Sequence, residues 1–210
     1  MRIHIIFHSI HGHCYQMARE IEQGIRQVEG IITGIYRVPE TLPANTLADM
    51  GATQSLARMS GVPVATMNEL EDADGIVLGA PTYFGTPSCQ MMSFLHGAGP
   101  QWAEGRLMGK VGASFTTASE QNGGAETCLH TLNDFFYHQG MLIVPMPTAL
   151  TVNEMHEEQI PVGGYAYGAS MITGGLNDRD ITDQEAAIAR LQGRQIAGVV
   201  RDLLRSRKEK

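Results

Sequence analysis

The sequence lacks long apolar runs, an even set of cysteines and a surplus of positive charge. No hydrophobic stretch approaches the roughly 20 residues that span a bilayer, so we expect no membrane association. The three cysteines at positions 14, 89 and 128 are odd in number and widely spaced, which favours reduced thiols and a cytoplasmic protein over a disulfide framework. A formal net charge of -7 argues against nucleic acid as a partner, because a polyanion binds to a basic surface.

Two common phosphate-binding motifs are also absent. The chain has no G-x-x-x-x-G-K-[ST] loop, and no G-x-G-x-x-G follows its first apolar run. These absences argue against a site for a nucleoside triphosphate or a dinucleotide at the first turn.

This first turn joins a short predicted strand to a predicted helix. Residues 3–7 form a nearly continuous apolar run, typical of a central parallel strand. Beyond it Cys14, Ala18 and Ile21 begin a stripe with the period of an amphipathic helix. A helix start offers free N–H groups and a positive dipole end to a phosphate, while Ser9 adds a hydroxyl and Gly12 lets the backbone approach closely. A small phosphate ester such as flavin mononucleotide (FMN) is therefore the leading ligand.

The rest of the chain repeats the order of strand and helix, in what we predict is a single domain of residues 1–210. The predicted strands are 3–7, 31–38, 75–79, 110–116 and 141–144, and the predicted helices after the first are 67–73, 88–96, 125–136 and a final one from Thr182. This alternation predicts an α/β fold, an open five-stranded parallel sheet with helices on both faces. The loops after the first, third and fourth strands should then converge on one pocket.

Two stretches have no clear period. Residues 39–66, punctuated by proline and glycine, are predicted to be a loop, and a second excursion follows between residues 145 and 175. Long loops in compact domains tend to be functional or to serve assembly, so both suggest assembly around a shared active site. After them, Thr182 and Glu185 are spaced as a capping box that begins the final helix.

Six short motifs carry a family resemblance. They are Ser9-Ile10-His11-Gly12-His13, Val38-Pro39-Glu40-Thr41, Pro81-Thr82-Tyr83-Phe84-Gly85, Trp102-Ala103-Glu104-Gly105, His138-Gln139-Gly140-Met141 and Tyr167-Gly168-Ala169. Each is weak alone, but in this order and spacing they resemble the WrbA family of NAD(P)H:quinone oxidoreductases over nearly the whole chain. The resemblance implies a flavodoxin-like fold, FMN as cofactor, NADH or NADPH as electron donor, a quinone as acceptor and a homotetramer.

The resemblance also implies roles for individual residues. The turn after the first strand would hold the FMN phosphate, the segment around Thr82 the flavin ring and ribityl chain, and residues 117–123 the ring edge. The residues that it assigns to the cofactor are Ser9, Ile10, His11, Gly12, His13, Cys14, Pro81, Thr82, Tyr83, Phe84, Gly85, Thr117, Ala118, Ser119, Gln121, Asn122, Gly123 and His138. His138 matches a flavin-contacting histidine and is the candidate catalytic residue, whereas Trp102 and His11 would meet the substrate.

The sequence departs from the commonest family pattern at three places. His11 stands where a tyrosine that helps the nicotinamide is usual, and Tyr83 replaces an arginine beside the flavin. The loop after the fourth strand has Thr-Ala-Ser-Glu-Gln-Asn before its two glycines instead of a run rich in glycine and threonine. These departures bear on the nicotinamide preference and on the flavin potential.

Several of these residues also have plainer interpretations. His138 could cap a carbonyl at a helix end, and Trp102 could belong to the core or to an interface. Cys14 is expected to pack rather than to act as a thiol of low pKa. The histidines around the first turn lack the spacing that brings four ligands onto zinc, so we expect no metal site.

Three classes of function remain open from the sequence. The first is the quinone reductase, in which hydride passes from the nicotinamide to the flavin and both electrons then pass to a quinone, in ping-pong order. The second is a flavodoxin-type electron carrier without steady-state turnover, although such carriers are usually shorter. The third is a regulatory module that has kept the fold without the chemistry.

Overall fold

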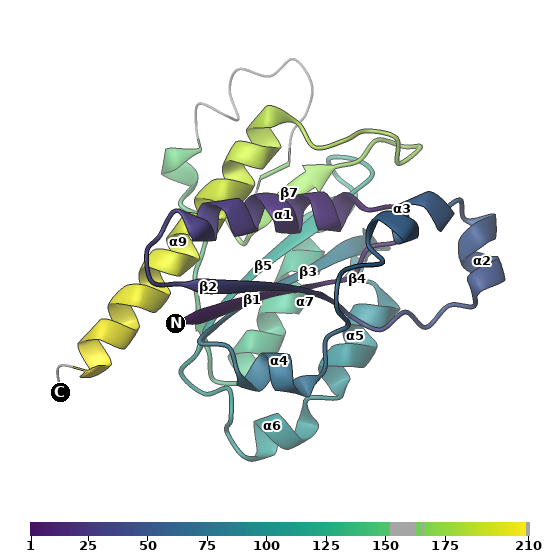
Figure 1. Ribbon diagram of the computed structural model, residues 1–210. Coiled ribbons are helices and arrows are strands. Elements are labelled where there is room, and N and C mark those ends of the chain that lie inside the picture. Colours follow the sequence, from purple (N-terminus) through teal and green to yellow (C-terminus); the bar gives the residue numbers. More distant parts are fainter. Residues whose placement is uncertain (152–162, 165, 209–210) are drawn as a thin grey trace.

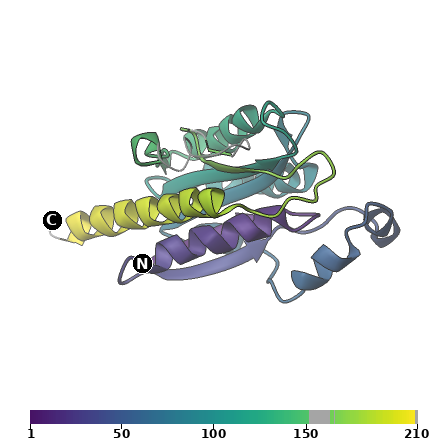
Figure 2. The same cartoon turned by 90° about the horizontal axis from the view of Figure 1, so that it is seen from above.

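The computed structural model describes residues 1–151, 163–164 and 166–208 (Figure 1). Its helices are α1 (His13–Arg26), α2 (Ala44–Asp49), α3 (Thr53–Arg58), α4 (Met67–Glu71), α5 (Cys89–His96), α6 (Gly99–Ala103), α7 (Ala125–His138) and α9 (Asp183–Lys208), with a 3-10 turn at Thr148–Leu150. Its strands are β1 (Arg2–Phe7), β2 (Ile32–Arg37), β3 (Gly75–Tyr83), β4 (Thr86–Pro87), β5 (Val111–Ala118), β6 (Leu142–Ile143) and β7 (Ala169–Ile172). A central sheet lies between two layers of helices (Figure 2).

The sheet is parallel in the order β2-β1-β3-β5-β6, with β7 also paired to β5. The short β6 lies beside the start of β5, at Val111 and Gly112, and β7 lies beside its end, from Phe115 to Ala118. Together β6 and β7 fill the fifth position of the sheet. The predicted five-stranded parallel sheet is confirmed, in a version whose fifth strand comes from two separate segments.

Most boundaries differ from the sequence predictions by one or two residues, and four differences are larger or have a clear physical cause. The fifth strand was predicted as 141–144 but stops after Ile143, because prolines 145 and 147 cannot donate to a ladder. The stretch 39–66 contains α2 and α3, and the link around Trp102 contains α6. Helices of five or six residues make fewer than two turns, too few for a hydrophobic period to be visible. The third strand continues beyond Gly79 to Tyr83 and turns into an antiparallel hairpin with β4.

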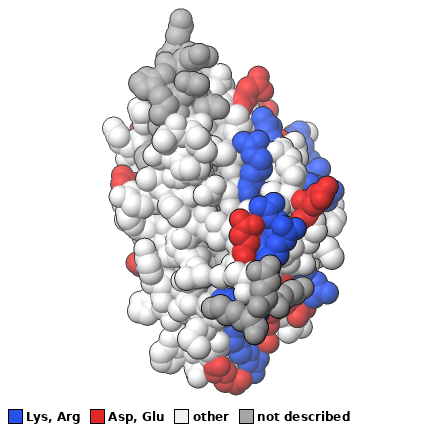
Figure 3. Space-filling view, turned by 90° about the vertical axis from the view of Figure 1, so that its left-hand side faces the viewer, with Lys and Arg blue, Asp and Glu red and all other residues white. Residues whose placement is uncertain are grey.

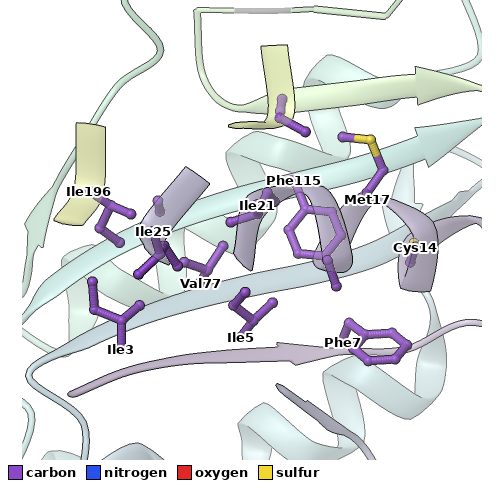
Figure 4. Close-up of a cluster of buried hydrophobic side chains, with 14 of the residues drawn as sticks. Ile3, Ile5, Phe7, Cys14, Met17, Ile21, Ile25, Val77, Phe115 and Ile196 are labelled. Carbon is purple, nitrogen blue, oxygen red and sulfur yellow. The ribbon is translucent and has the colours of Figure 1, made fainter. Parts of the chain in front are cut away.

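Alternate residues of the strands divide the core between the two faces of the sheet. Ile3, Ile5 and Phe7 of β1 face α1, as Figure 4 shows. Ile6 faces the opposite layer, where it belongs to a cluster with residues of α5 and α7. The two faces are thus covered by different helix layers, as a doubly wound sheet requires.

Helices α1 and α9 lie side by side on one face (Figure 1) and touch through glycine. A Cβ atom on Gly24 would lie 1.9 Å from the backbone oxygen of Arg190, and one on Gly193 would lie 2.1 Å from that of Ile21. Only glycine allows this approach. The predicted capping box begins α9, since Thr182 Oγ1 accepts from the Glu185 N–H and Glu185 Oε2 accepts from the Thr182 N–H, at 3.2 and 3.1 Å.

The carboxyl ends of the parallel strands meet at the end of the molecule away from both chain termini (Figure 1). Within the described ranges, none of the helices combines the length and apolar character that crossing a membrane demands.

Candidate functional site

A cavity of about 720 Å³ opens at the carboxyl ends of β1, β3 and β5. Its described walls come from the three loops that were predicted to converge, from the chain after β7 and from the corner between α2 and α3. The lining residues are Ser9, Ile10, His11, His13, Met50, Pro81, Thr82, Tyr83, Phe84, Gly85, Thr117, Ala118, Ser119, Glu120, Asn122, Gly123, Gly124, Thr173 and Asn177. The volume is in the range of cavities that bind small ligands and cofactors.

The turn after β1 leaves hydrogen-bond donors without partners among the residues that the structure describes. Gly12 is the N-cap of α1 with φ of +91°, and no side chain caps the first turn. Its N–H donates to Ser9 Oγ at 3.0 Å, so the Ser9 hydroxyl still has its own proton to donate. Free N–H groups, a hydroxyl and the positive end of the α1 dipole fit a phosphate group.

Two histidines flank this turn. Burial lowers the pKa of His11 below its ordinary value. Burial, and after it the neighbouring His11, lowers the pKa of His13, while Asp180 acts in the opposite direction. The lowered pKa values favour the neutral form of both side chains, and an anion bound beside them would favour the protonated form. Among the described residues, no group of three or more histidine, cysteine, aspartate or glutamate side chains is placed to share a metal ion.

A buried polar chain lies behind the turn. His8 Nε2 contacts Glu40 Oε2 at 3.1 Å, and Gln90 of α5 donates to Glu40 Oε1 at 2.6 Å. Burial lowers the pKa of His8. Burial acts to raise the pKa of Glu40, but hydrogen bonds from Leu42, Gln90 and His8 outweigh it and hold that pKa below the usual range. A neutral imidazole and a carboxylate thus tie the turn to the 38–42 loop and to α5.

The hairpin between β3 and β4 brings an aromatic ring to the mouth of the cavity. Phe84 is fully exposed and has φ of +51°, followed by Gly85 at +81°. A left-handed conformation is costly for a phenylalanine, and such strain is found mainly at functional sites. An exposed ring beside a cavity can pack on a planar ligand.

Gly124 fixes the position of this hairpin. It is the N-cap of α7 with φ of +85°, and a Cβ atom there would lie 2.6 Å from the Cα of Gly85. No side chain caps α7 either, so a second uncapped helix start borders the cavity. Its N–H groups favour negative charge in the cavity.

Tyr83 both lines the cavity and packs against a small satellite core that includes Ile10, Leu47 and Ala52. Burial, and after it the neighbouring Cys14 and Glu40, raises the pKa of the Tyr83 phenol. At the position where the resemblance expects an arginine, the cavity therefore has a neutral ring.

Gly12, Cys14 and Gln121 were assigned to the cofactor but are not among the residues that line the cavity. Cys14 is completely buried, its Sγ lies 3.5 Å from Thr117 Oγ1, and burial raises its thiol pKa to about 12. The Cys14 side chain therefore packs in the core, in agreement with the plainer interpretation. Only its backbone N–H is part of the turn.

Five lining residues were missed by the sequence predictions. Thr173 and Asn177 follow β7, and Thr173 Oγ1 contacts Asn177 Oδ1 at 2.8 Å. They reach the cavity because β7 pairs with β5, and β7 gave no signal in the sequence beyond a four-residue apolar segment. Met50 comes from the α2–α3 corner and gave no signal. Glu120 and Gly124 lie in a loop that was assigned to the ring edge, so their omission could have been avoided.

His138 and Trp102 lie away from the cavity of their own chain. His138 ends α7, whose 14 residues begin at the cavity and extend about 20 Å from it. Trp102 is on α6 and 62% exposed, and Met108 and Tyr137 are similarly exposed apolar residues. Figure 3 views the end of the molecule opposite the cavity and shows its charged residues gathered along one side, leaving a broad part uncharged.

Residues 1–155 match the family described as NADPH-dependent FMN reductase. A relative named NAD(P)H dehydrogenase (quinone) from Geotalea uraniireducens is 40% identical over 205 residues, 98% of this chain and 100% of the relative. One of the same name from Methanosarcina barkeri is 39% identical over 97% of this chain and 99% of the relative.

Solved structures agree on the fold. A WrbA-like flavodoxin from Agrobacterium tumefaciens superposes with a TM-score of 0.63 at 20% identity, covering 96% of this chain and 98% of the other. An archaeal flavodoxin superposes with a TM-score of 0.59 at 15% identity, over 96% and 99%. The flavodoxin-like fold predicted from the sequence is confirmed.

Proposed function

Because this chain belongs to the NADPH-dependent FMN reductase family, we propose that it is an FMN-dependent oxidoreductase that passes two electrons from NADH or NADPH to a quinone. The observation that carries the proposal is the cavity at the carboxyl ends of the strands, with an uncapped helix start at one end and an exposed aromatic ring at the other. Two relatives named NAD(P)H dehydrogenase (quinone) are 40% and 41% identical to this chain over 98% of its length.

The chain's residues fit FMN. Ser9 and the N–H groups after Gly12 would hold the phosphate, and residues 82–84 and 117–123 would border the ring system. FMN supplies the chemistry of accepting a hydride from a nicotinamide and releasing two electrons to a quinone. The protein orients both substrates in one cavity, which they use in turn in ping-pong order. The uncapped start of α7 offsets the negative charge that accumulates there.

His138 and Trp102 keep their predicted roles only in an assembly. His138 lies about the length of α7 from its own cavity and Trp102 is not among the residues that line it, so contact with a flavin or a quinone has to be made at the cavity of another subunit. The exposed Trp102, Met108 and Tyr137 support burial of that end against another chain. The proposal therefore includes a homotetramer with shared sites, and it places this single-domain protein in the cytoplasm.

Steady-state turnover tests the enzyme against the electron carrier. Protein reconstituted with FMN should oxidise NADH or NADPH in the presence of benzoquinone, and a carrier should show no sustained turnover with either. Ser9→Ala removes the hydroxyl at the turn and should weaken FMN binding about 10-fold to 150-fold, which corresponds to the loss of a hydrogen bond to a charged group. Ser206→Ala, on the exposed end of α9, is the matched control and should bind FMN as the native protein does.

A further inference from the structure

The loop between β7 and α9, residues 173–182, forms a wall of the cavity to which the family resemblance assigns no cofactor contact. Two of its residues, Thr173 and Asn177, line the cavity. Asn177 has φ of +54°, and its N–H donates to the Gly174 oxygen at 3.0 Å in a tight turn. Asparagine adopts this left-handed conformation more readily than most residues with a side chain. The turn therefore fixes the backbone of Asn177 at the cavity without a large cost in strain.

The side chain of Asn177 is held by its oxygen. The buried Thr173 hydroxyl donates to Asn177 Oδ1 at 2.8 Å. The other acceptor near that hydroxyl is the Ala118 oxygen at 3.4 Å, which already accepts from the Thr173 N–H at 2.8 Å. Because the oxygen is engaged, Asn177 has its two amide N–H groups left to donate. Among the described residues none accepts a hydrogen bond from Asn177 Nδ2, so both are available to a ligand in the cavity.

One carboxylate holds both ends of this loop. Glu185 is fully buried, and its Oε1 accepts from the Ile172 N–H at 2.9 Å, directly before the loop. Its Oε2 accepts from the Thr182 N–H at 3.1 Å, at the end of the loop. Within the loop, Arg179 Nη2 donates to the same Oε1 at 2.5 Å, and the Arg179 N–H donates to the Thr173 oxygen at 3.0 Å. Glu185 thus closes the loop at its base.

The first turns of α1 hold the far half of the loop. The Ile181 N–H donates to Gln16 Oε1 at 3.0 Å, and Gln16 Nε2 donates to Asp180 Oδ1 at 2.7 Å. Asp180 is also close enough to His13 to affect its pKa. The loop is therefore fixed between the start of α9 and the helix start proposed for the phosphate. A donor that is already held in place loses little freedom when it binds a ligand.

We propose that Asn177 donates a hydrogen bond to an acceptor oxygen of the bound flavin and that Glu185 is the positioning residue that holds Asn177 in place. The inference rests on the proposed function, because it takes FMN as the ligand of the cavity. It adds a binding residue from the chain after β7, which no local sequence pattern predicts. Glu185 acts only through the loop, since its two oxygens are occupied by backbone groups and by Arg179.

Dissociation constants of FMN and riboflavin, measured with the flavin-free protein, test the role of Asn177. Asn177→Gly keeps the left-handed backbone, removes the amide and should weaken FMN binding about threefold or more. Asn177→Asp keeps the bond from Thr173 but has no donor, and it should weaken FMN binding at least as much because its charge repels the phosphate. Leu176→Gly changes an exposed neighbour that does not line the cavity, so it is the matched control and should leave the affinity unchanged.

The two ligands locate the acceptor. If Asn177→Gly weakens FMN and riboflavin equally, the acceptor oxygen is on the ribityl chain or the ring. If it weakens FMN alone, the acceptor is on the phosphate. Either result supports the proposal, whereas an Asn177→Gly protein that binds both flavins as the native protein does would overturn it.

A double-mutant cycle tests the role of Glu185. Glu185→Gln should weaken FMN binding in the native background but have little further effect when Asn177 is already glycine, because the two residues act as one unit. A purely structural role would give additive losses, and that result would overturn the assignment of Glu185. If Glu185→Gln does not fold, Arg179→Lys, which keeps the charge but loses the planar fork, enters the same cycle.

These binding measurements are independent of turnover. A protein whose FMN affinity depends on Asn177 but which does not oxidise NADH or NADPH would refute the oxidoreductase and leave the inference standing. Turnover with an FMN affinity that Asn177→Gly does not change would overturn the inference alone. A protein that binds no flavin would overturn both.

Discussion

Protonation of His11 and His13 should couple FMN binding to pH. Both histidines border the turn proposed for the phosphate, and burial lowers both pKa values in the free protein. A bound phosphate would stabilise the imidazolium forms and raise those pKa values again. Protons are then taken up on binding, so the affinity for FMN should increase as the pH falls from 8 to 6.

The size of the effect follows from the number of histidines. Each can take up at most one proton, so the dissociation constant can fall by at most a factor of about ten per pH unit for each histidine. A cation about 4 Å from a phosphate charge near a protein surface gains between about 1 and 4 kcal/mol. We therefore expect FMN to bind about 10-fold to 100-fold more tightly at pH 6 than at pH 8. Below pH 6 the gain should level off, because the phosphate itself takes up a proton with a pKa of about 6.

Fluorescence quenching of FMN by the flavin-free protein measures this directly. Riboflavin, which lacks the phosphate, serves as the ligand control and should bind equally at both pH values. Replacing both histidines with glutamine should remove the pH dependence, whereas His96→Gln, on the last turn of α5 and outside the cavity, should preserve it. If riboflavin followed the same pH curve as FMN, the turn would not be the phosphate site.

Four other substitutions have defined outcomes. Gly124→Ala should destabilise the protein by about 2 kcal/mol or more in urea unfolding, since it places a Cβ atom against Gly85 at positive φ, while Gly198→Ala, with open space around it, should stabilise α9 by about 0.5–1 kcal/mol. Burial lowers the pKa of His8 below 6.5, so the neutral ring contributes stability above pH 6.5. That contribution to the free energy of unfolding should be lost as the pH falls through the folded-state pKa. His8→Gln should reduce the loss in unfolding curves recorded at several pH values. Trp102→Ala should lower quinone turnover and shift the sedimentation profile toward smaller species without changing FMN affinity, and an unchanged profile and rate would remove Trp102 from the shared site.

The first turn could be predicted from the sequence because its signals are local. An apolar strand, a glycine and a helix stripe within about 20 residues define where β1 ends and α1 begins, and the physics of a helix start then predicts the phosphate site. The stripe of α7 and the capping box of α9 were visible for the same reason.

The fifth position of the sheet could not be predicted in the same way. β6 has two residues and β7 has four, and they are joined to β5 by contacts far apart in the chain. Thr173 and Asn177 reach the cavity only through that pairing. No local sequence pattern predicts that these two residues reach the cavity.

The distance of His138 and Trp102 from the cavity is a different kind of limit. The motifs around both residues are local and visible, but a sequence does not say which chain completes a site. Because α7 separates His138 from the cavity of its own chain, His138 can contact a flavin only in an oligomer. The sequence pattern alone did not require an oligomer.

An anaerobic spectral titration tests the central claim most directly. The protein is mixed with excess FMN, desalted, titrated with NADH and then with benzoquinone. We predict a bound yellow flavin that one equivalent of NADH bleaches and one equivalent of benzoquinone restores. Flavin that binds but keeps its colour with both nicotinamides would contradict the oxidoreductase, and failure to retain flavin would contradict the assignment of the cavity itself.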